Sequence, residues 1–405
     1  MSRRTVSHTS ATGAELMAIE AGRARWSVTA VFVLHALMFA SWTAHIPDIK
    51  AELVLTNAQL GVALLGAPVG SVAAMPAAGW LLPRLGSRLV VQFTLAGFCL
   101  TAASVGLAGS LPWLFATLFG WGLFQGGLDV AMNTQAVAVE RVLGRPIMSG
   151  LHGGWSVGGF VGAAVGVASV DLKINLLPQQ LVLGLLAGLF VAASSRRLLP
   201  DSPTTYHTVP VDDRIDRPGA SLWQPAVFVL GLIAFASMLC EGAAADWSAV
   251  YFRDSLAAAP AVSGLGYAAF SAAMVTVRLA GNALLRRYSP HSLLSNLAAF
   301  ATLGFGGALL LNDQVAALIG FLTLGIGLGC LVPTTTSAAG NVPHLNRGTA
   351  IATVSAFGWF GFVVGPPLIG HLAAASSLTI ALIVLPALTT LIAISTRIAL
   401  VLRTP

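Results

Sequence analysis

Residues 89–128 read LVVQFTLAGFCLTAASVGLAGSLPWLFATLFGWGLFQGGL and contain no Asp, Glu, Lys or Arg. A helix that crosses a bilayer needs about 20 predominantly apolar residues, so this stretch is long enough for two crossings. Gly109, Ser110 and Pro112 lie in its middle and favour a turn there. The stretch therefore predicts two membrane-spanning helices joined by a short connection.

The composition of the whole chain indicates an integral membrane protein. Of its 405 residues, 56% are hydrophobic and only 9% are charged. A soluble protein of this length could not cover its surface with so few charges. Cys99, Cys240 and Cys330 all lie in apolar segments, which predicts buried thiols, no disulfide framework and no metal site.

Twelve apolar segments of suitable length follow one another along the chain, and the polar stretch 196–222 divides them six and six. We expect a tail at 1–26, a six-helix half at 27–195, a linker at 196–222 and a second half at 223–405. The expected spans are 27–46, 58–82, 89–109, 112–138, 147–169, 175–195, 223–246, 261–285, 292–311, 315–338, 349–373 and 377–401.

Lysine and arginine are distributed unevenly between the expected loops. With the N-terminus inside, seventeen of the 21 basic residues fall in cytoplasmic segments, while Lys50, Lys173 and Arg253 fall outside and Arg278 lies within a span. This bias predicts cytoplasmic termini in a bacterial-type inner membrane. It also accounts for the net charge of +6 without an acidic partner, so the sequence argues against binding of nucleic acid.

The two halves resemble each other at an offset of about 202 residues. The segment 79–84 (GWLLPR) matches 281–286 (GNALLR), and 156–162 (SVGGFVG) falls opposite 359–365 (WFGFVVG). Duplicated six-helix halves are typical of rocking-bundle transporters, whose site lies between the halves. The expected fold class is an all-α membrane protein with twelve transmembrane helices in two pseudo-symmetric halves.

Asp129 follows the charge-free stretch and lies inside an expected span. Gln125, Asp129 and Asn133 recur every four residues, so they share one helix face. A charge near the bilayer centre costs about 2.5–3.5 kcal/mol, so such residues usually face a bundle interior or a watery cavity. Burial favours the neutral carboxyl, which suits reversible proton carriage. We predict binding of substrate and of a proton here; a structural hydrogen-bond network is the alternative.

Other candidate site residues are aromatic or charged. His35 and Trp42 share a face of the first span and predict a polar group beside an aromatic wall, although a buried, satisfied histidine fits equally well. Trp155, near the membrane middle, and Trp359 are expected to extend this wall and to bind substrate.

The charged residues of the second half have several interpretations. Glu241 is either a second proton-coupling site, an outer gate, a partner for a basic group or a structural residue. Asp246 lies at the expected outer edge of its span, and Trp247 is expected in the interfacial aromatic belt. Arg278 is expected to extend toward the cytoplasm; capture of a substrate anion is the alternative.

Several motifs resemble the major facilitator superfamily. Its loop between spans two and three typically reads G-x-x-x-D-x-x-G-[RK]-[RK]; residues 79–88 read GWLLPRLGSR, with Pro83 at the acidic position. The segments 129–133 (DVAMN), 144–149 (GRPIMS) and 152–159 (HGGWSVGG) resemble the fucose-permease-like branch, particularly the YbjJ-like inner-membrane proteins.

The resemblance also implies roles for individual residues. In fucose permeases, a span-four Glu placed four residues before an Asn takes part in sugar and proton binding, and Asp129 and Asn133 occupy these positions. The span-five Asn of those permeases falls at Trp155, and in place of their span-one acid this chain offers His35. The implied substrate is a small polar solute, sugar-like or a related metabolite, and not necessarily fucose.

We therefore expect a monomeric secondary active transporter that works by alternating access and proton symport, embedded in the lipid bilayer and without a cofactor. Efflux of amphipathic compounds is one alternative, and a non-transporting membrane sensor is another. No enzyme motif survives inspection: the sequence has no G-x-x-x-x-G-K-[ST] phosphate loop and no Cys/His cluster with metal spacing.

Overall fold

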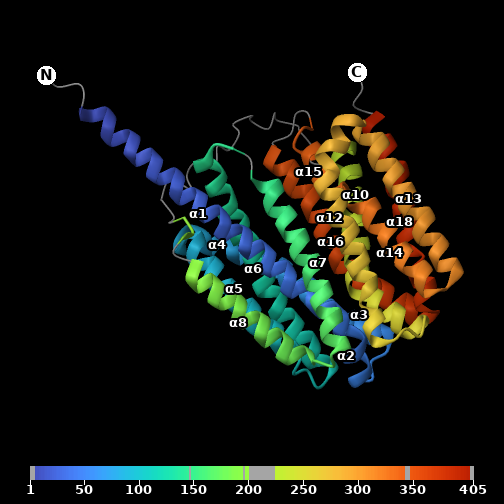
Figure 1. The fold of residues 1–405 in the computed structure, drawn as a ribbon. Coiled ribbons are helices and arrows are strands. Elements are labelled where there is room, and N and C mark those ends of the chain that lie inside the picture. The colour runs from blue at the N-terminus through green and yellow to red at the C-terminus, as the bar shows by residue number, and fades with distance from the viewer. Residues whose placement is uncertain (1–4, 146, 195–196, 200–223, 343–346, 402–405) are drawn as a thin grey trace.

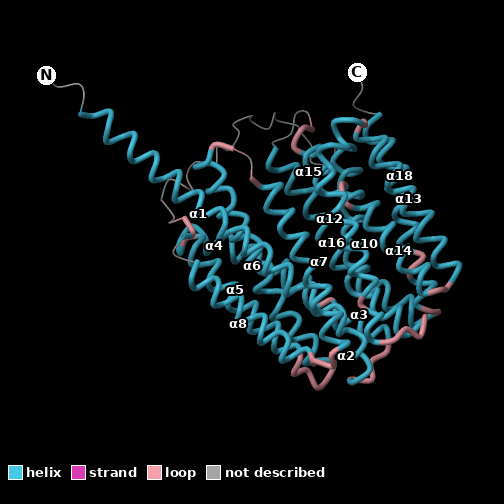
Figure 2. The backbone as a smooth tube through the Cα atoms, in the orientation of Figure 1, coloured by secondary structure: helices cyan, strands magenta, loops and turns pink. Residues whose placement is uncertain are grey.

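The computed structural model describes residues 5–145, 147–194, 197–199, 224–342 and 347–401, and every regular element in these ranges is a helix (Figures 1 and 2). This confirms the all-α prediction. The expected linker 196–222 lies almost entirely outside the described residues.

In the first half, each expected span corresponds to one helix or to consecutive helices. The elements are α1 (Thr5–Trp42), η1 (Thr43–His45), α2 (Ile46–Glu52), α3 (Asn57–Leu64), α4 (Gly66–Leu85), α5 (Ser87–Val105), α6 (Leu111–Leu143), α7 (Met148–Asp171) and α8 (Leu176–Ser194). The connection expected near Gly109 is residues 106–110, between α5 and α6.

The second half repeats this pattern. Its elements are α10 (Pro225–Val250), the π-helix η3 (Tyr251–Ser255), α11 (Pro260–Ser263), α12 (Leu265–Arg287), α13 (Pro290–Leu311), α14 (Gln314–Leu328), α15 (Leu331–Ala339), α16 (Arg347–Ala375), α17 (Leu378–Ala381) and α18 (Val384–Val401). By length and composition, ten helical segments of the described chain can cross a membrane. Helices α6 and α8 are not among these ten; the apolar part of α8, Leu176–Phe190, is shorter.

The helices form two groups that differ in colour in Figure 1: α1–α8 on one side and α10–α18 on the other. We call the end where α1 begins and α18 ends the terminal end, and the opposite end the distal end. The halves touch at the distal end, where α3 packs against α16 and α2 against α10. Away from that end, α7 packs against α12.

Glycines and ion pairs hold the distal contact together. A Cβ added at Gly370 would lie 3.0 Å from the Cα of Gly61, so α3 and α16 meet nearly backbone to backbone. Beside this contact, an Arg253 guanidinium nitrogen lies 3.1 Å from Oδ1 of Asp48, and Lys50 pairs with Asp254. Both ion pairs join α2 of the first half to η3 of the second.

Candidate functional site

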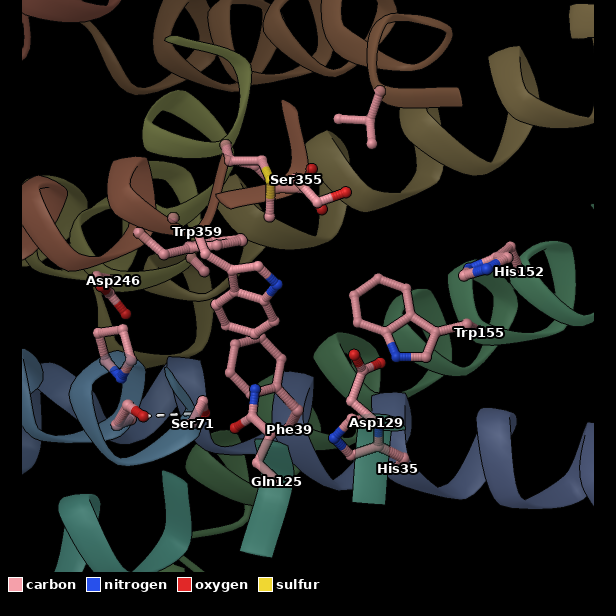
Figure 3. Close-up of a pocket in the computed structure, with 18 of the residues that line it drawn as sticks. His35, Phe39, Ser71, Gln125, Asp129, His152, Trp155, Asp246, Ser355 and Trp359 are labelled. Atoms are coloured by element: carbon pink, nitrogen blue, oxygen red, sulfur yellow. Dashed lines mark hydrogen bonds between the residues drawn. The ribbon is translucent and has the colours of Figure 1, made fainter. Parts of the chain in front are cut away.

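A cavity of about 330 Å³ lies between the two halves, and we call it the central cavity (Figure 3). Small-molecule sites commonly measure about 300–1,000 Å³, so it suits a small ligand. Helices α1, α3, α4, α6 and α7 line one side, and α10, α12, α15 and α16 line the other. Its polar lining residues are His35, Ser71, Gln125, Asp129, His152, Glu241, Asp246, Tyr267, Arg278, Thr336 and Ser355.

The central cavity brings together most of the residues singled out from the sequence. Glu241 lines it, as do all but one of the predicted substrate-binding residues, namely His35, Trp42, Gln125, Asp129, Trp155 and Trp359. These residues come from α1, α6, α7, α10 and α16. Residues that bind the same ligand must line the same cavity, and these residues do so.

Asn133 is the exception, because it lines a second cavity. This cavity measures about 1070 Å³ and lies between α4, α6, α7, α15 and α16. The Asn133 amide donates to the backbone oxygen of Asp129 at 2.8 Å and to its Oδ1 at 3.2 Å. Asp129 lines both cavities. Asn133 therefore orients the carboxylate, which lies where the two cavities adjoin.

His35 is buried, with 3% of its surface exposed, and packs edge to face on Phe98 with ring centroids 4.9 Å apart. Neither ring nitrogen has a hydrogen-bond partner within the described part of the chain. The alternative of a histidine satisfied by a backbone carbonyl therefore does not describe this residue. The residue lines the central cavity, and both of its ring nitrogens are buried.

Trp121 is a lining residue that the sequence reasoning missed. It packs edge to face on Trp42 at a centroid distance of 5.6 Å. The indole N–H is buried and has no partner among the described residues. Its position was available from periodicity, because Trp121 stands four residues before Gln125 and eight before Asp129 on the same helix face.

The expectation for Arg278 was wrong. Its side chain faces the central cavity, where it donates to Oγ of Ser156 at 2.9 Å and approaches Oε2 of Glu241 to 3.7 Å. Among the interpretations of Glu241, the partner of a basic group describes the geometry. The Arg278 side chain, from the second half, thus contacts α7 of the first half where α12 packs against α7.

Asp246 and Trp247 also lie elsewhere than expected. The span was expected to end at residue 246, but α10 continues to Val250 and η3 to Ser255. Asp246 therefore lines the central cavity, and Trp247 is fully buried instead of lying in an interfacial belt.

A bundle of membrane-length helices around a polar cavity between two repeated halves is the architecture of a membrane transporter. The Major Facilitator Superfamily profile matches residues 28–344, and the chain belongs to this family. Proteins of this family are transporters and not enzymes.

The relatives and solved structures agree with this assignment. An uncharacterized MFS-type transporter of Yersinia pestis is 33% identical over 88% of this chain and 90% of its own length. An uncharacterized transporter of Sinorhizobium fredii is 32% identical over 91% of this chain and 96% of its own. The crystal structure of the nucleoside transporter NupG superposes with a TM-score of 0.71 at 12% identity, covering 93% of this chain and 98% of that one. The last likeness concerns the fold alone.

Proposed function

We propose that this protein is a proton-coupled secondary transporter of a small polar solute, sugar-like or a related metabolite, and that it works by alternating access. The observation that carries the proposal is the position of Asp129, a membrane carboxylate that lines both cavities between the halves. A membrane carboxylate that becomes accessible to each side of the membrane in turn is able to take up a proton from one side and release it to the other.

Gln125, Trp155, Trp42 and Trp359 bind the solute in this proposal, and Glu241 takes part in coupling through Arg278. The motif around Asp129 and Asn133 supports a place near the fucose-permease-like branch. The basic residues of the expected loops support an inner-membrane protein with cytoplasmic termini. We propose that the transporter acts as a monomer, because each cavity is complete within one chain.

Efflux of amphipathic compounds is the second candidate function. It is favoured by the second cavity, which is lined mainly by apolar side chains such as Val130, Ile351 and Phe360. In inside-out vesicles, solute uptake driven by an acidic vesicle interior indicates export by exchange against protons. In right-side-out vesicles, solute uptake driven by an acidic outer medium indicates symport.

Asp129→Asn tests the coupling. The amide keeps the size and hydrogen-bonding capacity of the side chain but cannot ionise, so we expect folding and solute exchange to persist while uphill, proton-driven accumulation is lost. Solute accumulation in proteoliposomes with and without a pH gradient is the measurement. Asp171→Asn, at the exposed end of α7, is the matched control and accumulates like wild type. Wild-type accumulation by Asp129→Asn overturns the assignment of Asp129.

A further inference from the structure

The charges that line the central cavity are unequal in number. Asp129, Glu241 and Asp246 contribute three carboxylates, whereas Arg278 is the one Lys or Arg among the described lining residues. Arg278 already lies 3.7 Å from Glu241 and donates to Ser156. Within the described chain, Asp129 and Asp246 have no cationic partner. A positive group that entered the cavity would therefore find two carboxyl groups without a cationic partner.

The walls of the central cavity are suited to a positive group. Four tryptophans line it, and indole has the ring face that attracts cations most strongly. Trp359 and the Phe39 ring lie between Asp246 on one side and Asp129 on the other in the close-up (Figure 3). An organic cation bound in this cavity would therefore have both aromatic faces and carboxylates in its lining. The tryptophans are Trp42, Trp121, Trp155 and Trp359.

Two buried polar groups point independently to a ligand with hydrogen-bonding groups. His35, 3% exposed, has no partner at either ring nitrogen, and Trp121, 1% exposed, has none at its indole N–H, within the described residues. Both line the central cavity. Buried polar groups almost always have a hydrogen-bond partner, so we infer that a ligand in the cavity supplies the partner of these atoms.

We propose that the solute is a hydroxylated organic cation, a protonated amine whose ammonium group binds Asp246 while its hydroxyl groups reach His35 and Trp121. An anionic solute would face two unpaired carboxylates and a guanidinium that is already engaged. A neutral solute would leave the Asp246 carboxylate without a counter-charge in the cavity. This inference rests on the proposed function and names its substrate class.

The proposal divides the work between two carboxylates. Asp246 takes the ammonium group, and Asp129, across the Phe39 and Trp359 rings, remains free to take the coupling proton. Separate carboxylates allow the cation and the proton to be bound together, as symport requires. A single shared carboxylate would instead force the two to exchange.

Matched pairs of ligands test this inference. Glucosamine against glucose, and galactosamine against galactose, differ in one group, which at neutral pH is mostly an ammonium group in the first member and a hydroxyl in the second. Affinities for purified full-length protein are measured by titration calorimetry. We expect the amines to bind wild type about tenfold more tightly than the sugars, since a charge-assisted hydrogen bond replaces a neutral one. Asp246→Asn should abolish this preference, and Asp171→Asn should keep it.

The unliganded melting temperature of Asp246→Asn verifies that the variant is folded. The inference is overturned if the neutral sugars bind as tightly as the amines, if no amine binds, or if Asp246→Asn retains the preference. Proton-driven flux is a separate measurement. If the amine preference depends on Asp246 but the protein shows no proton-driven flux, the cation site is supported and the proposed function is overturned.

Discussion

The Glu241–Arg278 pair has most of both side chains buried, with 16% and 18% exposed, respectively. Removal of one member leaves the other charge without its partner, which costs about 3–5 kcal/mol when the pair is buried. We predict that Arg278→Gln and Glu241→Gln each lower the thermal stability of the purified protein. The double variant Glu241→Gln/Arg278→Gln should recover part of the loss, because it leaves no unpaired charge. Melting temperatures in detergent measure this.

Arg286→Gln, on the same helix in the terminal turn of α12, is the control and should leave the melting temperature unchanged. A double variant whose loss of stability relative to wild type equals the sum of the two single losses would contradict the pairing. That result would mean that the two side chains stabilise the fold through separate contacts.

Residue positions were predictable to the extent that helix periodicity alone decides them. Gln125 and Asp129 share a face of α6, and that face does line the central cavity. Arg278 was misplaced because side-chain length suggested a reach to the membrane surface, whereas the packing of α12 against α7 directs it to Ser156. Packing between distant segments has no signal in one sequence. Asp246 was misplaced because hydropathy ended the span too early.

Most elements were predicted within a few residues, but α1 begins at Thr5, inside the tail expected at 1–26, and the breaks inside several elements were not predicted. The helical paths of spans two, ten and twelve are interrupted at Leu65, Cys330 and Ile383. Pro68, Pro333 and Pro386 follow these breaks, each by three residues. Proline has no N–H to donate and its ring is tolerated in the first turn of a helix, so each proline fits the start of a new helix. The prolines were visible in the sequence; the apolar scan did not use them.

The α1–α7 contact supports a prediction at the level of elements. A Cβ added at Gly158, Gly162 or Gly166 would collide with backbone oxygens of α1, at Val33, Leu37 and Ser41 respectively. Gly162→Leu should therefore separate the two helices and reduce the folded yield, because small residues allow this close approach.

Gly159→Ala and Gly162→Ala form a matched pair for the same contact. A Cβ at Gly159 meets no atom within 4 Å, so Gly159→Ala should retain wild-type yield, whereas Gly162→Ala should lower it. Size-exclusion chromatography of the detergent-solubilised protein measures the folded fraction. Equal yields from the two variants would show that α1 and α7 adjust to the added methyl group.

At the scale of the whole molecule, the distal end is where the halves are joined across the duplication. Ala44 lies in this contact, because a Cβ added at Gly264 would lie 2.9 Å from the Cβ of Ala44. Alternating access requires the distal contact to open, which separates Asp48 from Arg253 and Lys50 from Asp254. Exposed ion pairs contribute about 0–1 kcal/mol each, so they adjust the balance between the two states without locking it.

Charge reversal tests whether these pairs stabilise the closed distal end. Asp48→Arg and Arg253→Asp each replace attraction by repulsion, and a change of about 1 kcal/mol shifts the population of the open state roughly fivefold. In the double variant, positions 48 and 50 of α2 are both positive and positions 253 and 254 of η3 are both negative, so attraction returns. The readout is the rate at which a membrane-impermeant maleimide labels Ala44→Cys in a background without native cysteines. Residue 44 is buried when the distal end is closed. Faster labelling in both single variants and wild-type labelling in the double variant are expected. If the double variant labels as fast as the single variants, glycine packing and not the ion pairs closes the distal end.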